Sequence, residues 1–197
     1  MKRIIFVFAL FLFYSSCDVC KDRHYPFTEQ DLKFFPYQHK QYLFLKDNNN
    51  KLTKYEVSVH RDYGEQHYMI KAGCGKTFVE GIDIGFTLPG KTCGIEEGCL
   101  GTIFGKRDEY GFTISYSLGD GNIRGSFVHE DTSTAYTFHD QITIEGKNYK
   151  NVYEYWIPAY LSLDYPLVDK TSRLFYNGEV GIIKLVYPNG NYLVFEK

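Results

Sequence analysis

Hydrophobic and polar residues alternate with a period of two along several stretches of the chain, which is the pattern of β-strands with one buried face. The alternation is clearest over residues 55–60, 112–118 and 141–145. Turn signals separate such runs, among them Asn177-Gly178 and Asn189-Gly190, which favour type I′ hairpins because both central residues need a positive φ. The end of the chain is therefore predicted to be a meander of three strands, over residues 173–176, 179–187 and 191–196.

One short helix is expected near the N-terminus of the domain. Thr28 can cap it, Asp31 stands at the capping-box position, and Pro36 ends it. The fold is predicted to be mainly β, an antiparallel meander of about nine or ten strands with this single helix. One-sided alternation favours a sheet that curls into an open or closed barrel, and a two-sheet β-sandwich is the alternative.

The first sixteen residues have the pattern of a secretory signal peptide. Lys2 and Arg3 precede an apolar run over residues 4–13, and Ser15 and Ser16 follow it. The run is too short for a transmembrane helix, which needs about 20 apolar residues. A buried strand or helix of the fold is the other reading, but cations directly before the run favour a signal peptide that is removed.

Cys17 directly follows the small residues and resembles the lipidated cysteine of a bacterial lipobox. The usual lipobox has Leu three residues earlier, where this chain has Tyr14, so ordinary signal-peptidase cleavage is the alternative. Lipidation adds three acyl chains and would hold the protein at a membrane. The expected organisation is a signal peptide over 1–16, a lipidated N-terminus and tether over 17–27, and one β domain over 28–197. This predicts an envelope protein at the outer membrane, on its periplasmic or surface side.

Charge argues against a nucleic-acid partner. Loss of residues 1–16 removes two of the 22 basic residues and none of the 24 acidic ones, which changes the formal charge from −2 to −4. A mildly acidic chain without a basic run lacks the electrostatic footprint of nucleic-acid binding.

The remaining cysteines suit an oxidising compartment. Cys20, Cys74, Cys93 and Cys99 are an even number, as expected for disulfides in an exported chain. Cys93 and Cys99 flank a glycine-rich loop and are the preferred candidate pair, while reduced thiols are the alternative. Zinc is disfavoured because the spacing lacks two close Cys/His pairs, and no metal site is predicted.

Residues 85–92, from Gly85 to Thr92, match the phosphate-binding pattern G-x-x-x-x-G-K-[ST]. That chemistry needs a helix directly after the loop, but the following residues 93–98 form a poor helix. Pro89 also lacks one of the N–H groups that would hold phosphate. We interpret the pattern as a strand end plus a turn, and we expect no nucleotide and no cofactor.

No catalytic constellation is recognisable. The six histidines form no His-Glu-x-x-His motif, although hairpins could bring His60 to His67 and His129 to His139. No Gly-x-Ser-x-Gly elbow occurs. A hydrolytic site, if present, is expected on the loops over residues 73–101 or 158–171, because long loops on rigid sheets often carry function.

Aromatic residues are abundant, with 16 Phe, 18 Tyr and 1 Trp. Tyr153, Tyr155, Trp156 and Tyr160 crowd one stretch and are candidates for stacking on sugar rings. The alternative is that aromatic residues simply favour strands.

Three stretches resemble small lipoproteins of Bacteroidota: the signal ending at Cys17, the hairpin over residues 142–152, and the closing meander over 174–184 and 189–192. This resemblance implies an envelope address and no established activity, so no functional residue carries over. The sequence thus predicts a lipid-anchored β domain that binds a glycan or an envelope protein, or supports an envelope assembly, without catalysis. An envelope hydrolase acting on glycan or peptide is the alternative.

Overall fold

The computed structural model describes residues 22–66, 75–91, 98–118, 123–128, 136–157 and 172–196. The predicted signal peptide, Cys17 and the first part of the tether lie outside these residues, as do the predicted loop site over 158–171 and Tyr160. Among the described residues, no helix is long and apolar enough to cross a membrane.

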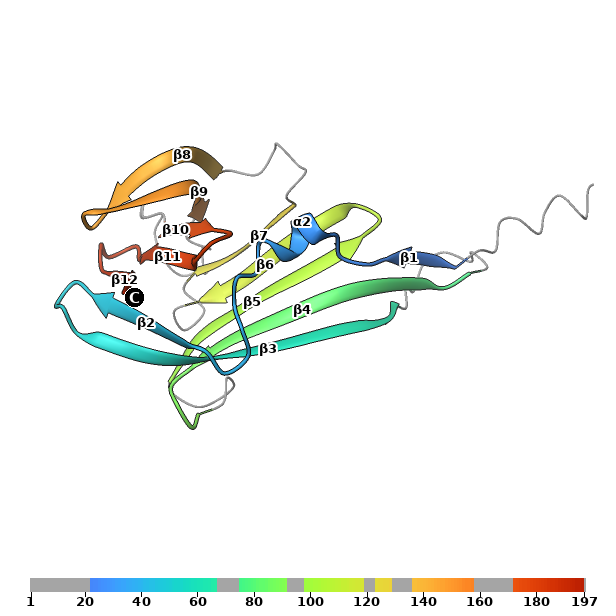
Figure 1. Cartoon of the computed structure of the whole chain (residues 1–197), viewed down its shortest axis with the longest axis horizontal. Helices are drawn as coiled ribbons and strands as arrows, with labels where there is room; N and C mark the ends of the chain where they lie inside the picture. The colour runs from blue at the N-terminus through green and yellow to red at the C-terminus, as the bar shows by residue number, and fades with distance from the viewer. Residues whose placement is uncertain are drawn as a thin grey trace, which may run out of the picture.

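The described chain forms one curled sheet, as predicted, in which all neighbouring strands but one pair are antiparallel (Figure 1). Its elements in chain order are β1 (Arg23–Tyr25), α2 (Glu29–Leu32), β2 (Tyr42–Asp47), β3 (Leu52–Gln66), β4 (Thr77–Thr87), β5 (Cys99–Asp108), β6 (Gly111–Leu118), β7 (Ile123–Val128), β8 (Tyr136–Ile144), β9 (Lys147–Ile157), β10 (Ser172–Asn177), β11 (Gly181–Val186) and β12 (Tyr192–Glu196). The described part holds twelve strands rather than nine or ten. Alternation alone does not reveal β1, which joins β4 in parallel.

Two meanders lie side by side in this sheet. The spatial order is β7-β6-β5-β4-β3-β2-β12-β11-β10-β9-β8, so β2 and β12 join the N-terminal meander to the C-terminal one. The strands β7 and β8 are consecutive in the chain yet form the two opposite edges. The result is an open half-barrel, in which β8–β12 curl over the strands β3–β6 (Figure 1).

The closing meander matches its prediction, but its turns differ. Neither Asn177 nor Asn189 has a positive φ, so neither Asn-Gly pair forms a type I′ turn. Asn177 instead closes a longer turn, because its side-chain oxygen accepts hydrogen bonds from the backbone N–H groups of Glu179 and Val180. Positive φ at two consecutive turn residues occurs at Glu145 (49°) and Gly146 (77°), between β8 and β9.

The concave side of the sheet is filled by residues 26–41, here called the strap, which include α2. The predicted capping box is confirmed, since Thr28 and Asp31 exchange backbone-to-side-chain hydrogen bonds. The Phe34 ring lies 5.8 Å from the Phe112 ring of β6 and 5.7 Å from the Tyr153 ring of β9. The strap therefore bridges the two meanders and supplies part of the main core.

Candidate functional site

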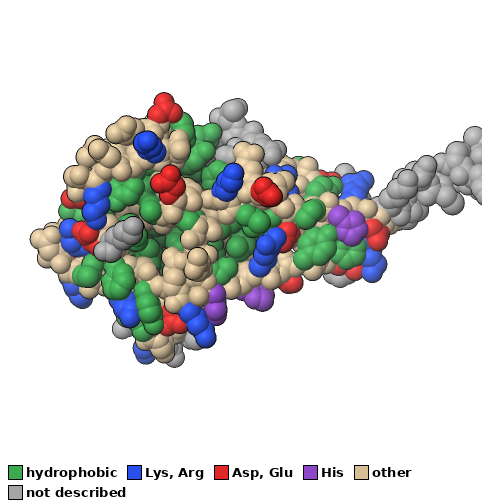
Figure 2. All heavy atoms as spheres, viewed as in Figure 1, with side chains coloured by type: hydrophobic (Ala, Val, Ile, Leu, Met, Phe, Trp, Pro, Cys, Tyr) green, Lys and Arg blue, Asp and Glu red, His purple; other side chains and the backbone are tan. Residues whose placement is uncertain are grey.

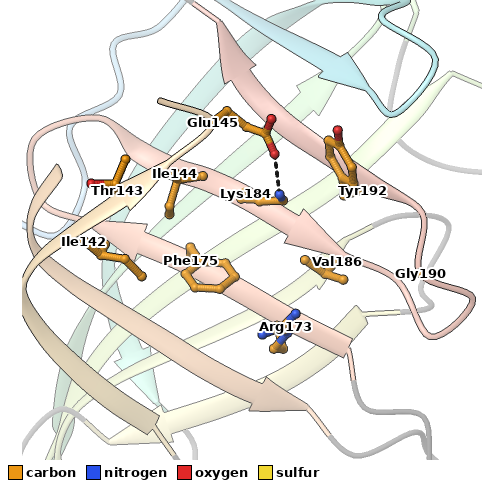
Figure 3. Close-up of a pocket in the computed structure, with 10 residues that line it drawn as sticks. All are labelled: Ile142, Thr143, Ile144, Glu145, Arg173, Phe175, Lys184, Val186, Gly190 and Tyr192. Carbon is orange, nitrogen blue, oxygen red and sulfur yellow. Dashed lines mark hydrogen bonds and ion pairs between the residues drawn. The ribbon is translucent and has the colours of Figure 1, made fainter. Parts of the chain in front are cut away.

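A groove of about 430 Å³ opens on the convex face of the sheet (Figure 3). Its walls come from the end of β8 and its turn, from β10 and β11, and from the β11–β12 turn with the start of β12. We call this the outer groove, and it is lined by Ile142, Thr143, Ile144, Glu145, Arg173, Phe175, Lys184, Val186, Gly190 and Tyr192.

Strand alternation aims these side chains outward. In β10, Leu174 and Tyr176 belong to the core on the concave side, so Arg173 and Phe175, which alternate with them, face the convex side. The register of β10 with β11 shifts between Phe175 and Tyr176. Such a bulge adds one residue to the partner strand, so Ile183 and Lys184 both serve the convex face.

The base of the groove is a second, smaller apolar cluster. Its buried members are Ile144, Val152, Phe175, Ile183 and Val194. The tip of the β8–β9 hairpin is fixed over this cluster by two ion pairs, from Lys184 to Glu145 and from Lys147 to Glu196, both at 2.7 Å. The groove is therefore built on hydrogen-bonded strands and a packed apolar base, which make its walls rigid.

Lys184 is held from two sides. Its ammonium group contacts the Glu145 carboxylate at 2.7 Å and lies 4.0 Å from the centre of the Tyr192 ring. The hydrogen bond from Lys184 lowers the pKa of the Glu145 carboxyl below its ordinary value, so this carboxylate is charged at neutral pH. Figure 3 shows the three side chains at one end of the groove.

Arg173 also has several partners, at the other end of the groove. Its guanidinium lies 5.3 Å from the Trp156 ring and 5.7 Å from the Phe175 ring, and it contacts Glu154 at 3.3 Å. Glu154 is buried and also meets the Nε2 atom of His139 at 2.9 Å. Fixed partners leave Arg173 little freedom, so its remaining donors are preorganised beside the groove.

Cations and carboxylates are balanced at this site. Lys184 is matched by Glu145, and Arg173 is matched by Glu154. The lining itself holds two cations and one carboxylate, and the second carboxylate, Glu154, is buried beside Arg173. With that partner counted, the site offers hydrogen-bond donors and acceptors beside aromatic rings without an excess of either charge.

The predicted stacking aromatics fall on two faces, because consecutive strand residues point to opposite sides. Tyr153 and Tyr155 face the core, where burial raises the pKa of both phenols, and Tyr155 is only 2% exposed. Tyr155 is thus unavailable to a ligand on the surface. Trp156 faces outward, is 41% exposed and flanks the outer groove through Arg173. Tyr160 lies outside the described residues.

The predicted disulfide and the possible histidine pairs fall only partly within the described residues. Cys99 is disulfide-bonded, but Cys93 lies outside the described residues, so their pairing stays a prediction. His67 and His129 also lie outside them, so neither possible histidine pair is tested, and His139 contacts Glu154. No group of three His, Cys, Asp or Glu side chains in the described ranges could hold a metal ion.

The phosphate-binding pattern begins in a strand. β4 runs through Gly85 to Thr87, and a turn follows in which the Lys91 N–H donates to the Leu88 carbonyl at 3.0 Å. Thr92 lies outside the described residues. The expectation that the chain binds no nucleotide stays a prediction.

Sequence reasoning missed most residues of the outer groove, including Glu145, Arg173, Lys184 and Tyr192. A usable signal existed in β11, where Lys184 interrupts the apolar run of Gly181–Val186. A cation inside such a strand indicates a special environment, but its partners could not be read from spacing. No family model, curated protein or solved structure matches this chain.

Proposed function

We propose that the chain is a lipid-anchored cell-envelope protein whose β domain binds a glycan in the outer groove, without catalysis. The observation that carries this proposal is the pairing of fixed charges with aromatic rings along one rigid groove. Lys184 lies against Tyr192, and Arg173 lies against Trp156 and Phe175.

A sugar offers the chemistry that complements this lining. Its ring has an apolar face for the aromatic side chains, and its hydroxyls can both donate to carboxylates and accept from cations. The cavity of about 430 Å³ falls within the usual range for small-ligand sites, about 300–1,000 Å³. Strand-borne residues with fixed partners lose little entropy on binding, which favours affinity.

The charge balance favours a neutral glycan over an anionic one. An anion would have to compete with Glu145 for Lys184 and with Glu154 for Arg173. The mature chain, without Lys2 and Arg3, would carry a formal charge of −4, which repels anions weakly at long range.

A glycan array probed with the mature chain tests this proposal. Lys184→Ala should lower affinity for a bound neutral glycan by about tenfold, which corresponds to 1.4 kcal/mol. The matched control is Lys54→Ala, because Lys54 also lies over a tyrosine ring, that of Tyr42, at 3.5 Å and away from the groove. Equal affinity in the two variants, or an array without any bound glycan, would reject the proposed site.

The proposed anchor rests on the sequence pattern that ends at Cys17. Mass spectrometry of the mature N-terminus should find Cys17 as the first residue, carrying three acyl chains. An unmodified N-terminus, or a mature chain that lacks Cys17, would remove the anchor from the proposal and leave the groove untouched.

A hydrolase is the second candidate, and the contact between His139 and Glu154 favours it. The pair has the composition of an acid–base dyad. Arg173 shares the same carboxylate, however, and His139 is not among the residues that line the groove. If the protein hydrolyses a glycan or a peptide and His139→Ala abolishes this activity, the proposed function would be catalysis rather than binding.

A further inference from the structure

Three aromatic rings stack across neighbouring strands at the end of the sheet where β1 begins. The His24 ring of β1 lies 4.8 Å from the Phe78 ring of β4, with an angle of 3° between the planes. The Tyr63 ring of β3 lies 6.2 Å from Phe78 and 6.3 Å from His24. The Tyr63 hydroxyl also meets the Nδ1 atom of His24 at 2.6 Å. We call these three residues the ring ladder.

The ring ladder lies beyond the main core and faces solvent. Tyr63 is 44% exposed, His24 is exposed and Phe78 is half-buried. Figure 2 shows hydrophobic and histidine side chains adjoining at this end of the molecule. Another aromatic residue lies nearby, since Tyr110 in the β5–β6 turn is 72% exposed and its neighbour Glu109 pairs with Arg23 of β1.

The chain itself places this end close to the proposed anchor. His24 follows Cys17 by seven residues, so even a fully extended tether spans about 25 Å at most. The strands of the outer groove, β8 and β10–β12, lie at the opposite end of the long axis from β1 (Figure 1). An anchor at Cys17 would therefore bring the ring ladder, and not the outer groove, to the membrane.

The cations described at this end are already matched by carboxylates within the protein. Arg23 pairs with Glu109 at 3.1 Å, Lys76 pairs with Glu65 at 2.9 Å, and Arg61 pairs with Glu80. A surface of this kind does not require anionic lipid. Tyrosine and other amphipathic rings instead favour the interface between headgroups and acyl chains.

We propose that the ring ladder, together with Tyr110, contacts the headgroup region of the bilayer that holds Cys17 and thereby directs the outer groove away from the membrane. The inference rests on the proposed anchor for its biological setting. The contact itself can be weak, because a short tether keeps its effective concentration high.

Fluorescence quenching by brominated phosphatidylcholine vesicles tests the contact. The chain from Asp18 onward carries an N-terminal hexahistidine and is captured on a nickel-chelating lipid, so this end is held at the bilayer whether or not cells lipidate Cys17. In one protein, Tyr63→Trp with Trp156→Phe puts the only tryptophan on the ring ladder. In the control protein, the native Trp156 reports from the groove end.

Quenching and a blue shift are expected for tryptophan at position 63, with little change for Trp156, and raising salt from about 0.1 M to 1 M should preserve the contrast. A second reporter, Tyr110→Trp with Trp156→Phe, covers the case in which the first substitution disturbs folding. Equal quenching at both ends, no quenching at either, or loss of the contrast in high salt would overturn the proposal. Mass spectrometry of Cys17 tests the anchor separately, so the two failures are distinguishable.

Discussion

The Asp31 carboxylate belongs to the strap, is only 2% exposed, and accepts hydrogen bonds from two nitrogens of Arg107 at 2.7 and 2.9 Å. Burial alone would raise the pKa of this carboxyl, but hydrogen bonds from Arg107 and Thr28 outweigh that effect and hold the pKa below its ordinary value of 3.8. Glu80 and Glu154 are also buried and each meets an arginine. Each of these carboxylates is tied to a cation on a distant part of the chain.

Asp31→Asn should lower the free energy of unfolding by about 3 kcal/mol at pH 7, because it leaves the Arg107 charge without its buried partner. Chemical denaturation of both proteins measures this loss. Glu29→Gln in the same helix is the control, since Glu29 is exposed and should change stability little. Equal losses in the two variants would show that the buried pair has no special role.

Acid should remove the contribution of Asp31. A carboxyl whose pKa is lower in the folded state stabilises the protein above its unfolded pKa, and that stabilisation disappears as pH falls through the folded pKa. The difference in unfolding free energy between the wild type and Asp31→Asn should therefore be full at neutral pH and shrink below about pH 4. A difference that stayed constant down to acid pH would contradict the lowered pKa.

The sequence predicted one of the two interactions of Asp31, the local one. The capping box of Thr28 and Asp31 spans three residues and follows from local chemistry. The partner, Arg107, lies 76 residues away, and which side chains meet across such a distance depends on the register of the whole sheet. Lys184 and Glu145 were missed for the same reason, because they meet across 39 residues.

Strands and turns were predictable where their signals are local. The closing meander was placed within one or two residues of β10, β11 and β12, since alternation and turn residues mark it directly. The turn types were not predicted correctly, because Asn177 uses its side chain to close a longer turn. The position of the strap inside the half-barrel could not be predicted from the sequence either. It depends on Phe34, Phe35 and Tyr37 filling a space that other elements create.

Gly105 in β5 shows how closely the strap fits the sheet. A Cβ atom at this position would lie 2.2 Å from the Phe35 ring, so Gly105→Ala should destabilise the protein by about 1–3 kcal/mol. Gly64→Ala in β3 is the matched control, because its Cβ would meet nothing within 4 Å. Thermal unfolding of both variants measures the contrast, and a Gly105→Ala protein as stable as the control would mean that the strap does not pack there.

The described part of the molecule forms one half-barrel, whose two meanders are held together by the strap. Phe34 contacts rings from β6 and β9, which belong to different meanders. Tyr37 accepts a hydrogen bond from the backbone N–H of Ile182 at 2.7 Å, which fixes the other end of the strap to β11. Neither meander has a complete core without this shared segment.

The two meanders should consequently unfold together. Trp156 in β9 reports on the C-terminal meander by fluorescence, while far-ultraviolet circular dichroism reports on all strands. Denaturant titrations followed by the two methods should have the same midpoint, as expected for one cooperative domain. Two separate midpoints would indicate that the meanders are independent units.

Glycan binding in the outer groove is the central claim, and the fluorescence of Trp156 tests it most directly. Trp156 is the only tryptophan of the chain and lies against Arg173 at the end of the groove. Titration with neutral oligosaccharides should change its emission saturably, in the wild type and in Lys54→Ala but not in Arg173→Ala. Emission that no oligosaccharide changes, or an Arg173→Ala protein that titrates like the wild type, would contradict the assignment of the groove.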